Sequence, residues 1–185
     1  YLMGYGSLAL GHGHADIKGA VFEQLAENGT FLFGTPHKLE YSFAEKINSY
    51  YPSMEKMRYT NSGTEATLLA VRLATAYTEK KKIAKFEGHY HGGYNEVLYS
   101  INPKLSEAGE ETEPNAVAES SGLEQFSQEK PIILPFNNMK ATERLIREHS
   151  HELAAVMIEP VQGGFIPAEQ NFMDMLRRVT AENNV

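Results

Sequence analysis

The chain alternates between segments whose apolar residues recur every three or four positions and short runs that are mostly apolar. The first spacing places apolar side chains on one face of a helix, and short apolar runs are typical of buried strands. The predicted helices cover residues 15–28, 38–50, 64–79, 139–149 and 170–182. The predicted strands cover residues 56–60, 82–86, 131–136 and 153–158. Because strands and helices alternate, the pattern predicts an α/β fold with a mostly parallel sheet and helices on both faces.

Polar turns that contain glycine follow or end three of these apolar runs. Their sequences are Asn-Ser-Gly-Thr-Glu-Ala at 61–66, Lys-Phe-Glu-Gly-His-Tyr-His-Gly-Gly at 85–93 and Val-Met-Ile-Glu-Pro-Val-Gln-Gly at 156–163. The carboxyl ends of parallel strands meet at one edge of a sheet, and open α/β proteins bind their ligands there. The sequence therefore predicts a ligand site at this edge.

The turn at 61–66 lies at the start of a predicted helix. A helix start presents free backbone N–H groups and the positive end of the helix dipole, which together favour a phosphate. Ser62 and Thr64 add hydroxyl groups, and Gly63 lets the backbone approach a ligand closely. These residues predict a site for a phosphorylated cofactor. The same residues also fit a plain helix start, with Ser62 or Thr64 as the N-cap and Glu65 in the first turn.

The net charge of −7 is concentrated in one acidic segment. Residues 105–129 contain seven Glu and neither Lys nor Arg, so the rest of the chain holds 17 acidic and 17 basic residues. A nucleic-acid-binding role is not expected, because it calls for a basic face. The acidic segment is poor in aromatic residues and rich in Ser, Gly, Ala and Pro, which is typical of a mobile or inserted loop.

Composition limits the expected cellular compartment and the kinds of metal site. No apolar stretch approaches the roughly 20 residues that cross a bilayer. The chain has no cysteine, which excludes disulfides and thiolate metal sites. His12 and His14, like His89 and His91, are two positions apart, but no cluster of carboxylates completes a metal site. We therefore expect a cytoplasmic protein without a bound metal.

Four motifs occur together in this chain. They are the turn at 61–66, Phe-Glu-Gly-x-Tyr-His-Gly at 86–92, Glu-Pro-Val-Gln-Gly at 159–163 and Leu-Gly-His-Gly-His-Ala-Asp at 10–16. In order and approximate spacing they resemble the motifs of class III aminotransferases, which are pyridoxal 5'-phosphate (PLP) enzymes of fold type I. The similarity covers nearly the whole chain except residues 101–130. Within the family, the chain resembles the glutamate-1-semialdehyde aminomutases and their transaminase relatives. The resemblance implies the three-layer fold of these enzymes and PLP as the cofactor.

The resemblance also implies roles for residues of the turns at 61–66 and 85–93. Ser62, Gly63 and Thr64 would hold the PLP phosphate. Tyr90 would stack its ring on the pyridine face and so fix the plane of the cofactor. His91 would order the loop beside the cofactor.

Glu159 ends an apolar run at the predicted ligand edge. The resemblance to transaminases implies that this glutamate lies near the cofactor and pairs with an arginine that gates substrate carboxylates. The matching arginine would lie beyond Val185, and Glu159 is our candidate catalytic residue. Two alternatives stay open at this point. Tyr90 could be a core tyrosine under the sheet, and Glu159 could cap a neighbouring helix.

Two parts of the family's catalytic machinery have no counterpart in this sequence. The resemblance places the lysine that binds PLP as a Schiff base, and the aspartate that pairs with the pyridine nitrogen, C-terminal to Val185. None of Lys85, Lys130 and Lys140 lies in a matching context. By itself, the chain is therefore expected to be inactive.

The chain is expected to form one partial domain over residues 1–185, the N-terminal part of the PLP-binding large domain. Its beginning resembles the inside of the strand that precedes the family's Gly-His motif. We expect a leading segment over residues 1–35 and an acidic variable loop over residues 101–130.

The leading functional hypothesis is a PLP-dependent aminotransferase, which moves an amino group between an amino compound and a keto acid or aldehyde. The resemblance implies a homodimer for the complete enzyme. A close alternative is an aminomutase that converts glutamate-1-semialdehyde into 5-aminolevulinate. An alternative of another class is a non-catalytic module that binds a phosphate-bearing ligand. An unrelated nucleotide binder is disfavoured, because no Gly-x-x-x-x-Gly-Lys-[Ser/Thr] is present and no Gly-x-Gly-x-x-Gly lies between a strand and a helix.

Overall fold

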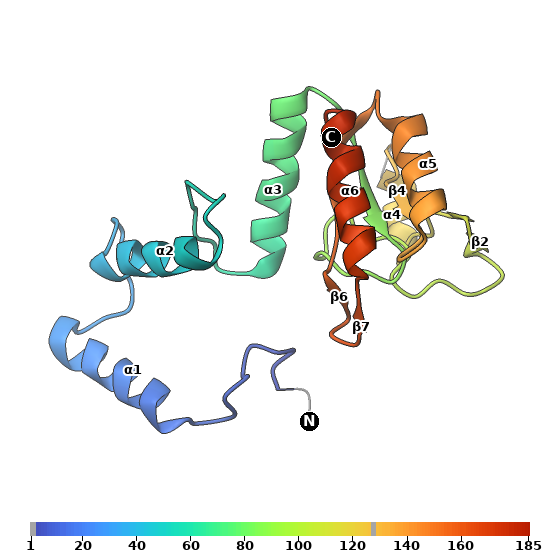
Figure 1. The fold of residues 1–185 in the computed structure, drawn as a ribbon. Helices are drawn as coiled ribbons and strands as arrows, with labels where there is room; N and C mark the ends of the chain where they lie inside the picture. Colours follow the sequence, from blue (N-terminus) through green and yellow to red (C-terminus); the bar gives the residue numbers. More distant parts are fainter. Residues whose placement is uncertain (1–2, 127–128) are drawn as a thin grey trace. The chain divides into compact units, whose positions relative to one another are not determined.

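The computed structural model describes residues 3–126 and 129–185 (Figure 1). The chain divides into two compact units, residues 1–58 and residues 59–185. All residues of the predicted cofactor site belong to the second unit. None of the described helices is both long enough and apolar enough to span a membrane.

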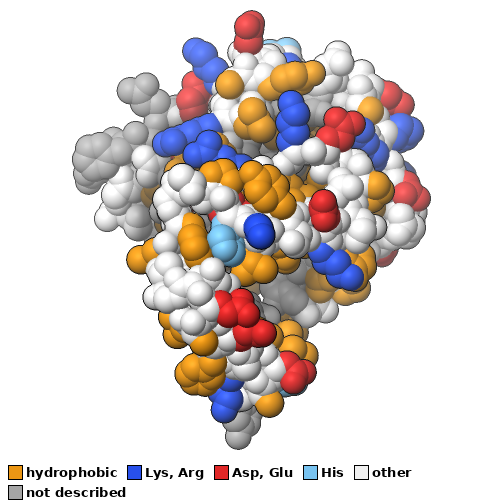
Figure 2. Space-filling model, turned by 90° about the vertical axis from the view of Figure 1, so that its left-hand side faces the viewer, with side chains coloured by type: hydrophobic (Ala, Val, Ile, Leu, Met, Phe, Trp, Pro, Cys, Tyr) orange, Lys and Arg blue, Asp and Glu red, His pale blue; other side chains and the backbone are white. Residues whose placement is uncertain are grey.

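The first unit contains two helices at the predicted positions, α1 (Ala15–Asn28) and α2 (Lys38–Tyr50). α1 ends at Gly29, and at the start of α2 the His37 ring accepts a hydrogen bond from the Leu39 N–H at 3.3 Å. Neither helix has a buried residue. Large apolar side chains such as Leu32 therefore remain exposed, and hydrophobic side chains are visible on the molecular surface in Figure 2.

Turns precede α1 where the resemblance implied a strand. Hydrogen bonds such as Gly11 N–H to the Leu8 carbonyl, at 2.8 Å, close these turns. Positive φ angles, which a strand does not allow, occur at Met3, Gly4, Tyr5 and Gly6. The implied strand is therefore wrong for the described residues of this segment.

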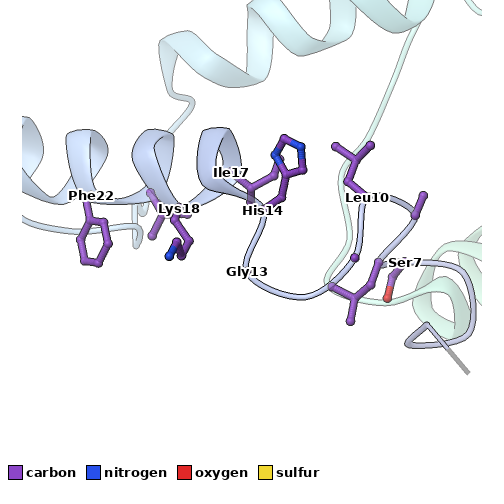
Figure 3. Close-up of a pocket in the computed structure, with 11 residues that line it drawn as sticks. Ser7, Leu10, Gly13, His14, Ile17, Lys18 and Phe22 are labelled. Carbon is purple, nitrogen blue, oxygen red and sulfur yellow. The ribbon is translucent and has the colours of Figure 1, made fainter. Parts of the chain in front are cut away.

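An apolar groove of about 360 Å³ lies between these turns and α1 (Figure 3). Leu10, Ile17 and Phe22 contribute to its wall, and none of the predicted site residues lines it. The groove therefore belongs to the surface of the first unit and is not part of the predicted cofactor site.

The second unit is built on a three-stranded parallel sheet in the order β4-β1-β5. β1 (Lys82–Phe86) lies in the middle, with β4 (Ile132–Leu134) and β5 (Leu153–Met157) on either side. These strands confirm three of the predicted runs and the parallel arrangement. Since all three run in one direction, their carboxyl ends meet at one edge of the sheet.

Four helices accompany the sheet. They are α3 (Gly63–Thr78), α4 (Ser121–Phe126), α5 (Met139–His149) and α6 (Gln170–Glu182). α3, α5 and α6 confirm the predicted helices within about one residue at each end. α5 and α6 lie side by side (Figure 1).

Helices cover both faces of β1, because successive side chains of a strand point to opposite faces. Ala84 and Phe86 join a buried apolar cluster with residues of α5 and α6. Ile83 joins a second cluster with Val71 of α3. This arrangement confirms the predicted three-layer α/β fold.

Residues 56–60, predicted as a strand, form none. A strand is stabilised by hydrogen bonds to a neighbouring strand, and the sheets of the described residues offer no partner to this segment. Alternation of Met57 and Tyr59 alone is therefore not sufficient, and this prediction is wrong.

The acidic segment contains regular structure as well as loops. β2 (Gly109–Glu110) and β3 (Glu113–Pro114) form a short antiparallel hairpin, and α4 follows it. Residues 127–128 of this segment lie outside the described residues. A second small hairpin, β6 (Val161–Gln162) with β7 (Ile166–Pro167), follows β5.

Candidate functional site

The start of α3 is closed by a variant of the capping box, in which Glu65 reaches the residue before the N-cap Ser62. Ser62 Oγ accepts a hydrogen bond from the Glu65 N–H at 3.2 Å, and Glu65 Oε2 accepts one from the Asn61 N–H at 2.8 Å. The plain helix-start interpretation is therefore correct for the Ser62 side chain. The N–H groups of Gly63 and Thr64 belong to the first turn, which offers them no acceptor within the helix. Since Gly63 is exposed and Thr64 half-buried, the cap and an anion can share this helix start.

The turn after β1 packs against the start of α3. The Thr67 hydroxyl donates a hydrogen bond to the His91 carbonyl at 2.6 Å. A Cβ added at Gly92 would come within 3.1 Å of Thr64 Oγ1 and 3.2 Å of Thr64 Cα. The φ of Gly92 is 118°, which other residues rarely adopt. Glycine at this position therefore lets the turn after β1 approach the start of α3 closely.

The side chains of Tyr90 and His91 have different surroundings, although the residues are adjacent. The Tyr90 side chain is 55% exposed, so the interpretation as a core tyrosine is wrong. His91 is buried, and its carbonyl is held by Thr67 as described above. Tyr90 can therefore present its ring to a ligand, while His91 faces the interior.

Glu159 follows β5 and joins the turn after β1 to the turn after β5. Its Oε1 accepts a hydrogen bond from the Tyr90 N–H at 2.6 Å, and its Oε2 accepts one from the Gly163 N–H at 2.7 Å. The Glu159 N–H donates to His89 Nδ1 at 2.9 Å. Neither carboxylate partner belongs to a helix start, so the interpretation of Glu159 as a helix cap is wrong.

Lys85 is a buried cation that the sequence analysis did not assign to the site. Its side chain is fully buried beneath the turn that follows β1, and its ammonium donates a hydrogen bond to the Tyr99 carbonyl. Burial lowers the pKa of the Lys85 ammonium to about 8, and the nearby Glu119 and Glu159 carboxylates oppose part of this shift. A lysine between apolar residues of a predicted buried strand was the signal that could have identified it.

The two histidines of the turn are held neutral near pH 7. Burial is the main cause that lowers the pKa of both the His89 and the His91 ring to about 4. The His89 ring also packs edge-on against Phe136, with 4.6 Å between the ring centroids. No group of three or more His, Cys, Asp or Glu suited to a metal ion occurs in the part of the chain that the structure describes.

The predicted site residues are therefore brought to one side of the second unit by two sets of contacts. Thr67 and Gly92 connect the start of α3 with the turn after β1, and Glu159 connects that turn with the one after β5. The arrangement is typical of an α/β protein that binds its ligand at the carboxyl ends of parallel strands. The model of the family "Aminotransferase class-III" matches residues 1–185, and the chain belongs to this family.

Similar proteins agree with this family. The chain is 43% identical to a glutamate-1-semialdehyde 2,1-aminomutase from Ignicoccus hospitalis over 98% of this chain and 41% of that protein. An omega-transaminase from Sphaerobacter thermophilus is 38% identical, with a TM-score of 0.90 over 100% of this chain and 42% of that structure. A transaminase with PLP bound is 31% identical, with a TM-score of 0.83 and the same coverage.

Two general facts follow from these comparisons. The chain spans about two fifths of the length of the relatives that it matches. The family consists of PLP-dependent enzymes, and the fold shared with solved transaminases confirms the predicted fold class.

Proposed function

We propose that the complete protein is a PLP-dependent class III aminotransferase that moves an amino group between an amino compound and a keto acid or aldehyde. The observation that carries this proposal is the meeting of three motifs at one site. The helix start at 62–64, the exposed Tyr90 ring and the turn after β5 are joined by hydrogen bonds and by the close approach of Gly92. The family match over the whole chain adds independent support.

The residues at the start of α3 fit the phosphate of PLP. Gly63 and Thr64 would donate their backbone N–H groups, and the Thr64 hydroxyl would add a third donor. Ser62 would contribute by fixing the helix start through its bond with Glu65. Charge-assisted hydrogen bonds of this kind contribute on the order of 1.5–3 kcal/mol each. The close approach of Gly92 to Thr64, which a side chain at position 92 would hinder, holds the turn that carries Tyr90 against this helix start.

The remaining residues would orient the cofactor. We propose that Tyr90 stacks on the pyridine ring, because its side chain is exposed beside the helix start. His91 would hold the turn in place through its buried ring and its carbonyl. Glu159 would connect the turn that carries Tyr90 with the turn after β5. When bound, PLP supplies the electron sink that makes amino transfer chemically accessible.

The second candidate is the aminomutase. It is favoured by the names of the relatives from Ignicoccus hospitalis and Sulfurisphaera tokodaii, both glutamate-1-semialdehyde 2,1-aminomutases at 43% and 42% identity. An aminomutase would use the same phosphate site and the same stacking tyrosine, so the proposed roles of Thr64 and Tyr90 do not depend on this choice.

The experiment is a comparison of full-length protein with and without an external amino donor. The protein is loaded with PLP and reduced with borohydride, and the mass increment is mapped by peptide analysis. We expect one cofactor-sized increment on a lysine outside residues 1–185. Activity is assayed on a separate, unreduced sample loaded with PLP: an aminotransferase releases a keto product only when an external amino donor is present, whereas an aminomutase converts glutamate-1-semialdehyde without a donor. Absence of any increment would contradict the proposed function and favour the non-catalytic module.

We also propose that the complete enzyme is a homodimer in the cytoplasm. The exposed apolar side chains of α1 and α2 support the dimer, because an apolar surface of this kind is commonly covered by another polypeptide surface. The absence of cysteine is compatible with a reducing compartment. The proposed small-molecule partners are an amino donor and a keto or aldehyde acceptor. Both units would belong to the PLP-binding domain.

A further inference from the structure

Glu159 directs both oxygens of its carboxylate to the main chain. The two donors, the N–H groups of Tyr90 and Gly163, lie at 2.6 and 2.7 Å. Such short charge-assisted bonds are among the stronger hydrogen bonds in proteins. With its own N–H bound to His89 Nδ1 at 2.9 Å, Glu159 makes two bonds to the turn after β1, while the bond from Gly163 fixes the carboxylate within the turn after β5.

The two turns are also in direct contact beside this carboxylate. Gln162 Nε2 lies 3.4 Å from the Glu87 carbonyl. A Cβ added at Gly88 would meet Gln162 Nε2 at 1.9 Å, so glycine here lets the Gln162 side chain lie directly against the turn after β1. This contact adds to the hydrogen bonds between the two turns.

A buried positive charge lies near the Glu159 carboxylate. The Lys85 side chain is fully buried, and Glu159 is one of two carboxylates whose charge favours the charged form of its ammonium. The Tyr99 carbonyl accepts a hydrogen bond from this ammonium. Lys85 and Glu159 therefore place opposite charges near one another at this edge of the sheet.

We propose that Glu159 is a positioning residue: its carboxylate holds the main chain of Tyr90, and it thereby sets the place of the Tyr90 ring against the cofactor. Glu159 acts through Tyr90 and does not need to contact substrate or cofactor itself. This inference rests on the proposed function, because it requires PLP over the Tyr90 ring.

The chain offers a matched control carboxylate. Glu119 also accepts two backbone hydrogen bonds, from the Ile101 and Asn102 N–H groups at 2.7 and 3.2 Å. It also interacts with Lys85. Unlike Glu159, however, it holds a segment other than the turn that carries Tyr90. Both bonds go to Oε1, which the amide oxygen of glutamine can replace, so Glu119→Gln removes a negative charge near Lys85 without releasing the proposed stacking residue.

The test measures PLP binding to the full-length protein for the wild type, Glu159→Gln, Glu119→Gln, Tyr90→Ala and the double variant Glu159→Gln with Tyr90→Ala. In Glu159→Gln, one backbone N–H faces an amide NH₂ instead of an oxygen. We expect Glu159→Gln to weaken PLP binding about tenfold and to change the visible circular dichroism of the bound cofactor, while Glu119→Gln stays within about twofold. In the Tyr90→Ala background, Glu159→Gln should have less than about a twofold effect.

The other outcomes distinguish failure of the inference on Glu159 from failure of the proposed function. If Glu159→Gln weakens binding equally with and without the Tyr90 ring, Glu159 acts on the cofactor directly and the inference is wrong. Unchanged affinity and circular dichroism in Glu159→Gln would also overturn it, while the proposed function would stand. Failure of the wild type to bind PLP would overturn the proposed function itself. If Glu159→Gln does not fold, Glu159→Asp, which keeps the charge but shortens the reach, takes its place in the same double-mutant cycle.

Discussion

The two faces of β1 differ in character, although neighbouring residues of the strand supply them. Toward α5 and α6, Ala84 and Phe86 join a cluster of buried apolar side chains. Toward the opposite face, Ile83 is followed by the buried ammonium of Lys85. The first face provides rigidity through close packing, and the second places charge beneath the turns of the candidate site. One strand therefore both anchors the core and supports the site.

The largest effect should come from opening the apolar face. Leu134 of β4 is fully buried in the cluster with α5 and α6. Leu134→Ala should destabilise the protein by about 2–5 kcal/mol, because it removes buried methyl groups and leaves a cavity. The measurement is the free energy of unfolding by urea. Leu105→Ala is the matched control, since Leu105 is 96% exposed and its truncation should cost under about 0.5 kcal/mol.

The next prediction concerns the charge on the opposite face. The pKa of Lys85 falls from 10.5 in the unfolded chain to about 8 in the folded protein. Between these values the unfolded state binds more protons, so the contribution of Lys85 makes stability rise with pH. From pH 7 to about pH 10 this contribution amounts to roughly 2.5 kcal/mol.

Lys85→Met should remove this rise. The measurement is the difference in unfolding free energy between wild type and variant at both ends of the pH range, which cancels the titration of other groups. An equal pH dependence in the two proteins would show that Lys85 is not buried as a cation. Lys81→Met is the control, because Lys81 lies directly before β1 and its side chain is exposed.

The smallest of the three effects concerns His89 in the turn after β1, which contacts both the apolar cluster and the candidate site. His89 packs against Phe86 and Phe136 with its ring, yet its Nδ1 accepts a hydrogen bond from Glu159. Its folded pKa of about 4 lies below the unfolded value of 6.5. Stability is therefore lost as pH falls between these values, because the unfolded chain binds the proton first.

At about pH 5 the expected loss from His89 is about 2 kcal/mol relative to pH 7. His89→Asn should reduce this acid sensitivity, since an amide oxygen can replace Nδ1 as acceptor without taking up a proton. Denaturation at the two pH values measures it. His151→Asn, at an exposed position, should leave the acid sensitivity unchanged. If His89→Asn loses as much stability as the wild type between pH 7 and pH 5, His89 is not the source of this acid sensitivity.

Most of the secondary structure was predictable because its signals are local. Gly29 marks the end of α1, and the run at 82–86 coincides with β1. The failed strand at 56–60 has the right alternation, but a strand also requires a partner that no local pattern contains. The lack of a partner strand therefore outweighs the local strand pattern at this position.

The candidate site was predictable in its members and not in its contacts. The helix start at 62–64 and the position of Tyr90 followed from motifs. The bonds of Glu159 to Tyr90 and His89 depend on how two turns meet, which sequence spacing does not encode. Lys85 was passed over because burial of its ammonium depends on the Tyr99 carbonyl and on carboxylates distant in sequence.

The parallel pairing of β1 with β5 has a consequence for biosynthesis. Lys82 pairs with Leu153, and the Tyr90 N–H reaches its acceptor on Glu159 across 69 residues of chain. Non-local pairings form slowly because a long loop must close first. During translation, α3 and β1 leave the ribosome well before their partner strand exists. Until β5 and α6 are made, one edge of β1 and part of its apolar face remain uncovered, and a translational pause before residue 153 would prolong the interval in which a chaperone can bind.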